Sequence, residues 1–170
     1  PFDLGTLQEI CSAKLGLGAQ ETLATAQALY ETHKATTYPR TDCGYLPESM
    51  LDEVPRVLHA LAAAAPSLGA VLTEVDPSRR SPVWNSEKIT AHHGIIPTAV
   101  KLDLAQLSER EQAVYALIRA RYLAQFLPEH EYLKTQAQLH SQSDQLLARG
   151  KQILVRGWRA VINEADSNEP

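Results

Sequence analysis

The spacing of apolar residues changes at Pro128, and this change limits the possible folds more than any other feature of the sequence. Before Pro128, apolar side chains recur every three or four residues, as at Leu23, Ala26 and Leu29, which is the spacing of a helix with one buried face. After Pro128, apolar and polar residues alternate as in a β-strand. The alternation places Leu133, Thr135, Ala137 and Leu139 on one face and Tyr132, Lys134, Gln136 and Gln138 on the other. We therefore predict a mainly α fold, with a helical domain over residues 1–128 and β-strands and a flexible tail over 129–170.

Two helices with a short turn between them are predicted at the start of the chain. Asp3 is suited to cap the first helix, and the glycines Gly16 and Gly18 end it. The second helix runs from about residue 20 to 33. It ends before Tyr38, because the following Pro39 favours an extended backbone at the tyrosine. The two helices are therefore expected to form an element like a helix-turn-helix.

Further helices are predicted in the middle of the chain. Pro47 or Pro55 is suited to the first turn of one broken helix, or of two short ones, that reach Pro66. Ser108 and Glu111 form a capping box ahead of a long helix, because each side chain is placed to bond the backbone N–H of the other.

A second strand is predicted over residues 146–155, after a turn within 140–144 and before Gly157 and Trp158. The two strands then form a long hairpin. Because an isolated hairpin is only marginally stable in water, we expect this one to belong to a larger sheet of a neighbouring domain.

Composition narrows the class of protein. A hydrophobic content of 44% and a charged content of 21% are typical of a soluble globular protein, and no apolar run is long enough to span a membrane. The chain begins with Pro1 and has no secretory signal, so we expect a cytoplasmic protein that begins partway through a longer one. A net charge of −4 is unfavourable for a protein that binds DNA, since phosphate affinity comes mainly from lysine and arginine.

The segment over residues 36–42 is the densest concentration of reactive side chains. A tyrosine hydroxyl has a pKa near ~10, so Tyr38 needs a neighbouring positive charge to act as a nucleophile. On an extended backbone Arg40 projects to the same side as Tyr38, and its guanidinium is suited to hold a phosphate. Asp42 is placed to orient Arg40 through a hydrogen bond. These residues alone also fit an ordinary turn without catalysis.

Two motifs resemble the active-site region of type IA DNA topoisomerases, closest to the bacterial topoisomerase III branch. The first is QALYETHKATTYPRTD over residues 27–42, and the second is AHHGIIPT over 91–98. The second departs from the family at Gly94, where alanine is usual. The resemblance extends over nearly the whole chain.

The resemblance implies roles for particular residues. Tyr38 matches the nucleophile that attacks single-stranded DNA and keeps the 5′ phosphate as a phosphotyrosine, and Arg40 matches the arginine that holds the phosphate. Thr41 and Asp42 match the end of the motif.

Other residues match positions that line the active site or contact DNA in the family. Gln27 and Glu31 are four residues apart and share one helical face, where they also fit a solvated surface. His92 matches the histidine of the second motif and is preferred to His93, although two exposed imidazoles on a loop are the simpler interpretation.

The resemblance also implies partners that are not in this sequence. Family members bind Mg²⁺ through the acidic cluster of a Toprim domain, and a hinge called the arch domain follows the helical domain. We therefore expect single-stranded DNA, the Toprim domain and the arch domain as partners, no metal in this chain, and no activity of the chain alone.

Alternatives remain at this point. The chain is also open to interpretation as a non-catalytic helix-turn-helix module that binds DNA. A recombinase or relaxase is disfavoured because the required arginine and histidine sets are absent. In the polar connection over residues 74–88, Arg79, Arg80 and Lys88 are suited to contact phosphates or simply to keep the loop soluble. The sequence does not distinguish a chromosomal from a plasmid origin.

Overall fold

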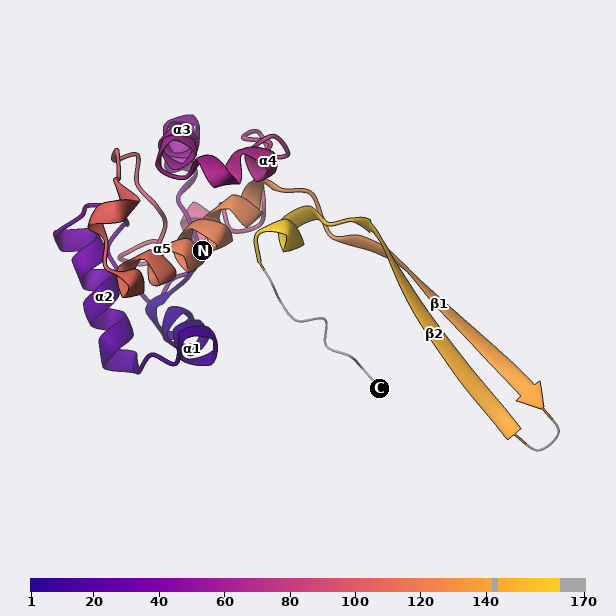
Figure 1. The fold of residues 1–170 in the computed structure, drawn as a ribbon. Helices are drawn as coiled ribbons and strands as arrows, with labels where there is room; N and C mark the ends of the chain where they lie inside the picture. The colour runs from indigo at the N-terminus through magenta and orange to yellow at the C-terminus, as the bar shows by residue number, and fades with distance from the viewer. Residues whose placement is uncertain (142–143, 163–170) are drawn as a thin grey trace.

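A computed structural model describes residues 1–141 and 144–162 and shows a helical body from which a long hairpin projects (Figure 1). The chain is 48% helical, which confirms the predicted fold class. The described α-helices are α1 Leu4–Leu15, α2 Ala19–Glu31, α3 Val54–Ala64, α4 Gly69–Leu72 and α5 Glu109–Leu123, and the strands are β1 Glu131–Ser141 and β2 Asp144–Val155. Short 3₁₀ helices occur at η1 Glu48–Glu53, η2 Pro66–Leu68, η3 Ser86–Lys88, η4 Leu104–Gln106, η5 Ala124–Phe126 and η6 Gly157–Ala160.

The helix ends follow the sequence signals. The Asp3 carboxylate accepts the N–H of Thr6 at the start of α1, and Gly16 ends that helix in the left-handed conformation, with φ of 66°. The capping box of Ser108 and Glu111 is formed at the start of α5. The apolar stripe that begins near Pro47 is divided between η1 and α3, which follow one another without a gap. Of the two arrangements that the sequence left open, the structure has two short helices.

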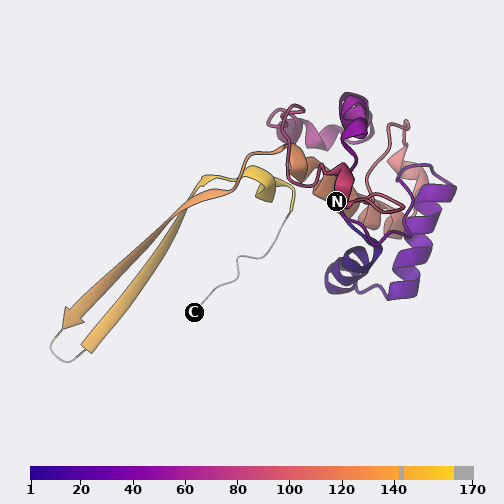
Figure 2. The ribbon, with the colours of Figure 1, turned by 180° about the vertical axis from the view of Figure 1, so that it is seen from behind.

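Helix α5 lies at the centre of the body, between the α1–α2 pair and the α3–α4 segment in both views (Figures 1 and 2). It contacts α2 directly. The side chains of Leu29, Val114, Ile118 and Phe126 are fully buried there, at 0% exposure. Because burying one large apolar side chain stabilises a fold by about 1.5–3 kcal/mol, this cluster fixes where α2 ends and therefore where the following segment begins.

The hairpin pairs β1 and β2 antiparallel, with Leu139 opposite Leu146. Gly157 follows it with φ of 52°, and a Cβ atom at this position would collide with the backbone oxygens of Pro128 and Glu129. The Trp158 N–H donates to the Pro128 carbonyl at 3.0 Å. Glycine is therefore required where the hairpin returns to the body. Residues 142–143 of the predicted turn and the predicted flexible tail, 163–170, lie outside the described residues.

Across the described part of the chain, no single helix has both the length and the apolar character needed to cross a bilayer. Only a pair bent by 114°, Glu48–Ala64 with Pro66–Leu72, meets the length and composition criteria together.

Candidate active site

Backbone hydrogen bonds bring the two sequence motifs together. The N–H of Thr37 donates to the Ile96 carbonyl at 2.9 Å, and the N–H of Thr98 donates to the Ala35 carbonyl at 3.0 Å. A β-bridge joins Thr36 to Pro97 in the same place. Segments 35–37 and 94–98, far apart in the sequence, are therefore held side by side. Tyr38 lies outside the helices, as predicted, between bends at Thr37 and Pro39.

Two threonine hydroxyls tighten this pairing. The Thr37 hydroxyl donates to the Gly94 carbonyl at 3.2 Å and accepts the Ile96 N–H at 3.0 Å. The Thr41 hydroxyl donates to the His92 carbonyl at 3.2 Å and accepts the Cys43 N–H at 3.1 Å. Thr41 is only 5% exposed. Its side chain therefore holds the backbone on either side of the candidate site and does not face the solvent.

Tyr38 is half-buried between two other rings. Its centroid lies 4.7 Å from that of His92, with an angle of 49° between the planes, and 5.5 Å from that of Tyr30, edge to face. Such contacts hold an aromatic ring in place without using its hydroxyl. The contact with Tyr30 was not predicted from the sequence, because the spacing of residues along one helix does not show which face meets the segment that follows it.

Two tyrosines of α5 have a different environment. Burial raises the pKa of Tyr115 to about 12, and burial with the nearby Glu53 raises the pKa of Tyr122 still further. A phenol that ionises so reluctantly is a poor nucleophile. Neither residue is therefore a rival to Tyr38.

Arg40 is exposed and connected to α2. Its guanidinium donates to the Gln27 side-chain oxygen at 3.0 Å, and the Gln27 amide nitrogen donates to the Glu31 carboxylate at 2.9 Å. Gln27 and Glu31 thus lie beside Arg40 on one helical face. The hydrogen bond expected between Asp42 and Arg40 is not formed among the described residues; the guanidinium points to α2, and exposed Asp42 lies apart.

Gly94, the departure from the family motif, is packed tightly. A Cβ atom here would lie 2.8 Å from the Pro1 Cβ and 3.3 Å from the Gly44 carbonyl carbon. The neighbouring N–H of Ile95 donates to the Phe2 carbonyl at 2.8 Å. The start of the chain therefore fills the space that an alanine side chain would need.

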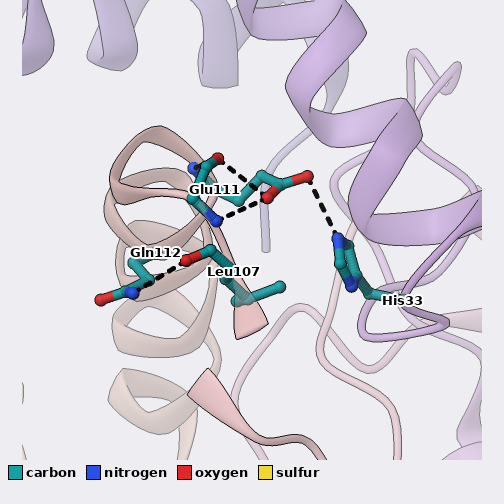
Figure 3. A network of polar contacts seen from close by, with 5 residues as sticks. His33, Leu107, Glu111 and Gln112 are labelled. Atoms are coloured by element: carbon teal, nitrogen blue, oxygen red, sulfur yellow. Dashed lines mark hydrogen bonds and ion pairs between the residues drawn. The ribbon is translucent and has the colours of Figure 1, made fainter. Parts of the chain in front are cut away.

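A polar network joins His33, just after α2, to the start of α5 (Figure 3). His33 Nε2 lies 3.1 Å from a Glu111 carboxylate oxygen, and the N–H and hydroxyl of Ser108 each donate to that carboxylate at 2.8 Å. Burial alone would raise the pKa of Glu111, but the hydrogen bonds from Ser108 and His33 outweigh burial and lower it. The capping box was predicted; the His33 contact was not, because its partner is distant in the sequence.

No group of three or more histidine, cysteine or acidic side chains within residues 1–141 and 144–162 is arranged to hold a metal ion. The residues described around Tyr38 therefore do not fit a Mg²⁺ site by themselves.

Comparisons with known proteins show the family of this chain. A family model described as "DNA topoisomerase" matches residues 1–170, the whole chain. The chain belongs to the type IA DNA topoisomerases.

Individual relatives in this family show how much of an enzyme the chain represents. It is 38% identical to "DNA topoisomerase 3" of Vibrio cholerae and 34% identical to "DNA topoisomerase 3" of Bacillus subtilis, with 99% of the chain aligned in both. It spans only 26% and 23% of the length of these relatives.

A solved structure has a similar fold. Full-length topoisomerase I from Thermotoga maritima superposes with a TM-score of 0.64 over 95% of this chain and 26% of its own, at 23% sequence identity. The chain therefore has the fold of about a quarter of a type IA topoisomerase.

Proposed function

We propose that this chain carries the nucleophile of a longer type IA topoisomerase and that Tyr38 is that nucleophile. The observation that supports this most directly is the juxtaposition of two motifs: Tyr38 lies against His92 of the second motif, and Arg40 is exposed two residues further on. The ring is held by its neighbours, and the structure records no hydrogen bond of its hydroxyl among the described residues. We propose that this oxygen is the atom presented to the substrate.

The proposed reaction is a transesterification on single-stranded DNA. The Tyr38 oxygen loses its proton and forms a bond to a backbone phosphorus, while the bond from phosphorus to the 3′ oxygen breaks. The 3′ oxygen takes a proton and leaves as a hydroxyl, and the 5′ phosphate stays on the tyrosine. One phosphodiester replaces another, so resealing is the reverse reaction and needs no ATP.

Arg40 is the residue that we propose to stabilise the charge on phosphorus. Its planar guanidinium matches two phosphate oxygens, and Gln27 holds it while leaving other N–H groups free to bind. Glu31 orients Gln27 in turn. His92 positions the tyrosine ring and, with exposed Asp42, lines the path of the strand, whereas buried Thr41 acts through the backbone that it holds.

We further propose the place of the chain in the whole enzyme. Residues 1–128 form the tyrosine domain, and 129–170 begin the arch domain that acts as its hinge. A Toprim domain from the remaining three quarters of the enzyme supplies the acidic groups for Mg²⁺, and the enzyme works on DNA in the cytoplasm. We expect the isolated chain not to relax supercoiled plasmid, because half of the active site is then missing.

The decisive experiment traps the covalent protein–DNA product with the full-length enzyme that carries this chain. Tyr38→Phe keeps the ring contacts and removes only the nucleophilic oxygen, so all covalent product is expected to disappear while binding of single-stranded DNA remains. Tyr132→Phe removes a hydroxyl from the hairpin and serves as the matched control, with unchanged cleavage. Covalent product from Tyr38→Phe would contradict the proposal and favour the helix-turn-helix alternative, formed by α1 and α2, in which Tyr38 has no chemical role.

A further inference from the structure

A pocket of about 480 Å³ lies between the end of α5, the polar connection after α4 and the 3₁₀ helix that follows the hairpin. Arg79 and Arg80 come from the connection, Arg121 from α5 and Trp158 from η6. None of the residues proposed above to act with Tyr38 lines it. We call this the arginine pocket.

The positive charge of the arginine pocket is poorly neutralised. Across residues 1–141 and 144–162, no carboxylate lies within 4.0 Å of the three guanidinium groups. The Nε atom of Arg79 is buried without a hydrogen-bond partner. A buried donor that is left unpaired is unfavourable, so an acceptor that enters the pocket and reaches this atom would stabilise it.

Nearby groups offset this charge only in part. Arg80 donates to the carbonyls of Pro77 and Arg79, at 3.0 and 3.2 Å, and these contacts fix its direction without neutralising it. The guanidinium of Arg121 lies 5.0 Å from the Phe2 ring centroid. Glu129 also lines the pocket, but it is exposed to solvent. The Asp76 carboxylate accepts the Ser78 hydroxyl at 2.6 Å and the Ser78 N–H at 2.9 Å. These hydrogen bonds, together with the charges of Arg79 and Arg80, lower the pKa of Asp76, so this carboxylate offsets part of the charge of the two arginines, whereas Arg121 has no such partner among the described residues.

We propose that the arginine pocket binds a nucleotide of single-stranded DNA, with its phosphate on Arg79 and Arg121 and its base near Trp158. Guanidinium groups fork onto phosphate oxygens. The same wall holds the Trp158 indole, whose ring centroid lies 5.4 Å from the Arg159 guanidinium, and aromatic rings are surfaces on which any base can stack. The volume exceeds that of a lone phosphate and falls in the range of small-molecule sites. The proposal rests on DNA being the substrate, and it adds a second contact with the strand, away from Tyr38.

Binding of a fluorescent single-stranded oligonucleotide by the 170-residue chain tests this proposal. The double variant Arg79→Gln with Arg121→Gln removes the charge and keeps much of the side-chain volume. We expect affinity to fall about tenfold. The slope of log K against log salt is negative, and we expect its magnitude to decrease by about 1, because each lost phosphate contact on a single strand contributes about 0.7.

A matched control separates a specific contact from a general loss of charge. Lys101→Gln with Arg110→Gln removes two exposed cations elsewhere and is expected to change affinity less than twofold. Arg79→Lys with Arg121→Lys keeps the charge and is expected to restore most of the salt slope but only part of the affinity, because lysine cannot fork onto two oxygens. Thermal unfolding of all variants verifies that each is folded.

Three outcomes would overturn the proposal. The first is equal binding by the pocket and control variants, and the second is no binding by the unaltered chain. The third is an oligoglutamate peptide that displaces the oligonucleotide more strongly than inorganic phosphate or a mononucleotide does, because the occupant would then be an acidic protein segment. Tyr38→Phe is expected to bind like the unaltered chain, so a failure of the cleavage chemistry remains distinguishable from a failure of this site.

Discussion

The helical body and the hairpin are stabilised in different ways, as the exposure of one leucine in each region shows. Leu29 in α2 is 0% exposed and packed against the core around α5, whereas Leu139 in β1 is 56% exposed. Every residue of β1 from 131 to 140 is exposed, and so is β2 from 144 to 154. Tertiary packing fixes the body, while pairing between two strands fixes the hairpin.

This difference indicates which region needs a partner to cover its apolar side chains. The body buries its apolar residues within the chain, so its candidate active site rests on a rigid support. The hairpin leaves a leucine-rich face uncovered, and a two-stranded sheet is marginal in water without a packed face. The proposed arch domain would supply that cover, and until it does the hairpin is expected to open locally while the body stays folded.

The largest expected effect comes from truncating one leucine in each region. Leu29→Ala is expected to lower the free energy of unfolding by about 3 kcal/mol, because it leaves a cavity in a dense core. Leu139→Ala is expected to lower it by less than about 0.5 kcal/mol, because its side chain is already half in water. Urea unfolding followed by circular dichroism measures both, and similar losses from the two variants would show that the hairpin is packed like the body.

The second-largest effect on stability is expected at the junction between the hairpin and the helical body. Gly157→Ala places a Cβ atom against the backbone of Pro128 and Glu129 at a positive φ. We expect a loss of about 2–3 kcal/mol, because neither backbone segment has room to move.

Gly150→Ala is the matched control, since a Cβ there meets no atom within 4 Å. It is expected to be neutral or slightly stabilising, because alanine reduces the freedom of the unfolded chain. Equal effects at the two glycines would mean that the hairpin and the body are not coupled through this turn.

The sequence predicts local structure in both regions because local structure depends on nearby residues. Asp3, Gly16 and the pair Ser108 and Glu111 mark helix ends, and the alternation after Pro128 marks the strands. The position of Tyr38 outside the helix follows from Pro39 in the same way. These signals act over a few residues, so one sequence is enough to read them.

Contacts between distant segments were not predictable in the same way. His33 pairs with Glu111, and Tyr38 packs against Tyr30 and His92, only because the core sets the distance between their elements. Arg40 donates to Gln27, and not to Asp42 as predicted, because α2 carries an acceptor beside its guanidinium. The juxtaposition of the two motifs was an expectation from family resemblance, and hydrogen bonds of residues 35–37 with 94–98 produce it.

A smaller effect concerns the network that fastens α2 to α5 within the body. The pKa of Glu111 lies below its ordinary value of 4.5, so its contribution to stability is present above that pH and is lost as pH falls through the lowered pKa. We expect Glu111→Gln to cost about 1 kcal/mol at pH 7 and to flatten the decrease in stability below pH 4.5. Urea unfolding at a series of pH values measures this.

Glu109→Gln removes an exposed carboxylate from the same helical turn and serves as the control. Its stability is expected to follow that of the unaltered chain at each pH. A pH profile of Glu111→Gln that matches this control would show that the carboxylate has the same free energy in the folded and unfolded states.

The smallest expected effect on stability comes from the uncovered face of the hairpin, and it is the most informative about partners. Leu139 and Leu146 are cross-strand neighbours, 56% and 60% exposed. Changing both to glutamine is expected to alter the free energy of unfolding by less than about 0.5 kcal/mol, yet to reduce concentration-dependent self-association in sedimentation experiments, because exposed apolar faces and open strand edges promote it.

Leu147→Gln with Ile153→Gln is the control and changes the opposite face, where both residues are 48% exposed. If the second pair of substitutions reduced self-association instead, the apolar face that a partner covers would be the one carrying Lys134 and Lys151. The hairpin would then present this opposite face to its neighbour in the assembled enzyme.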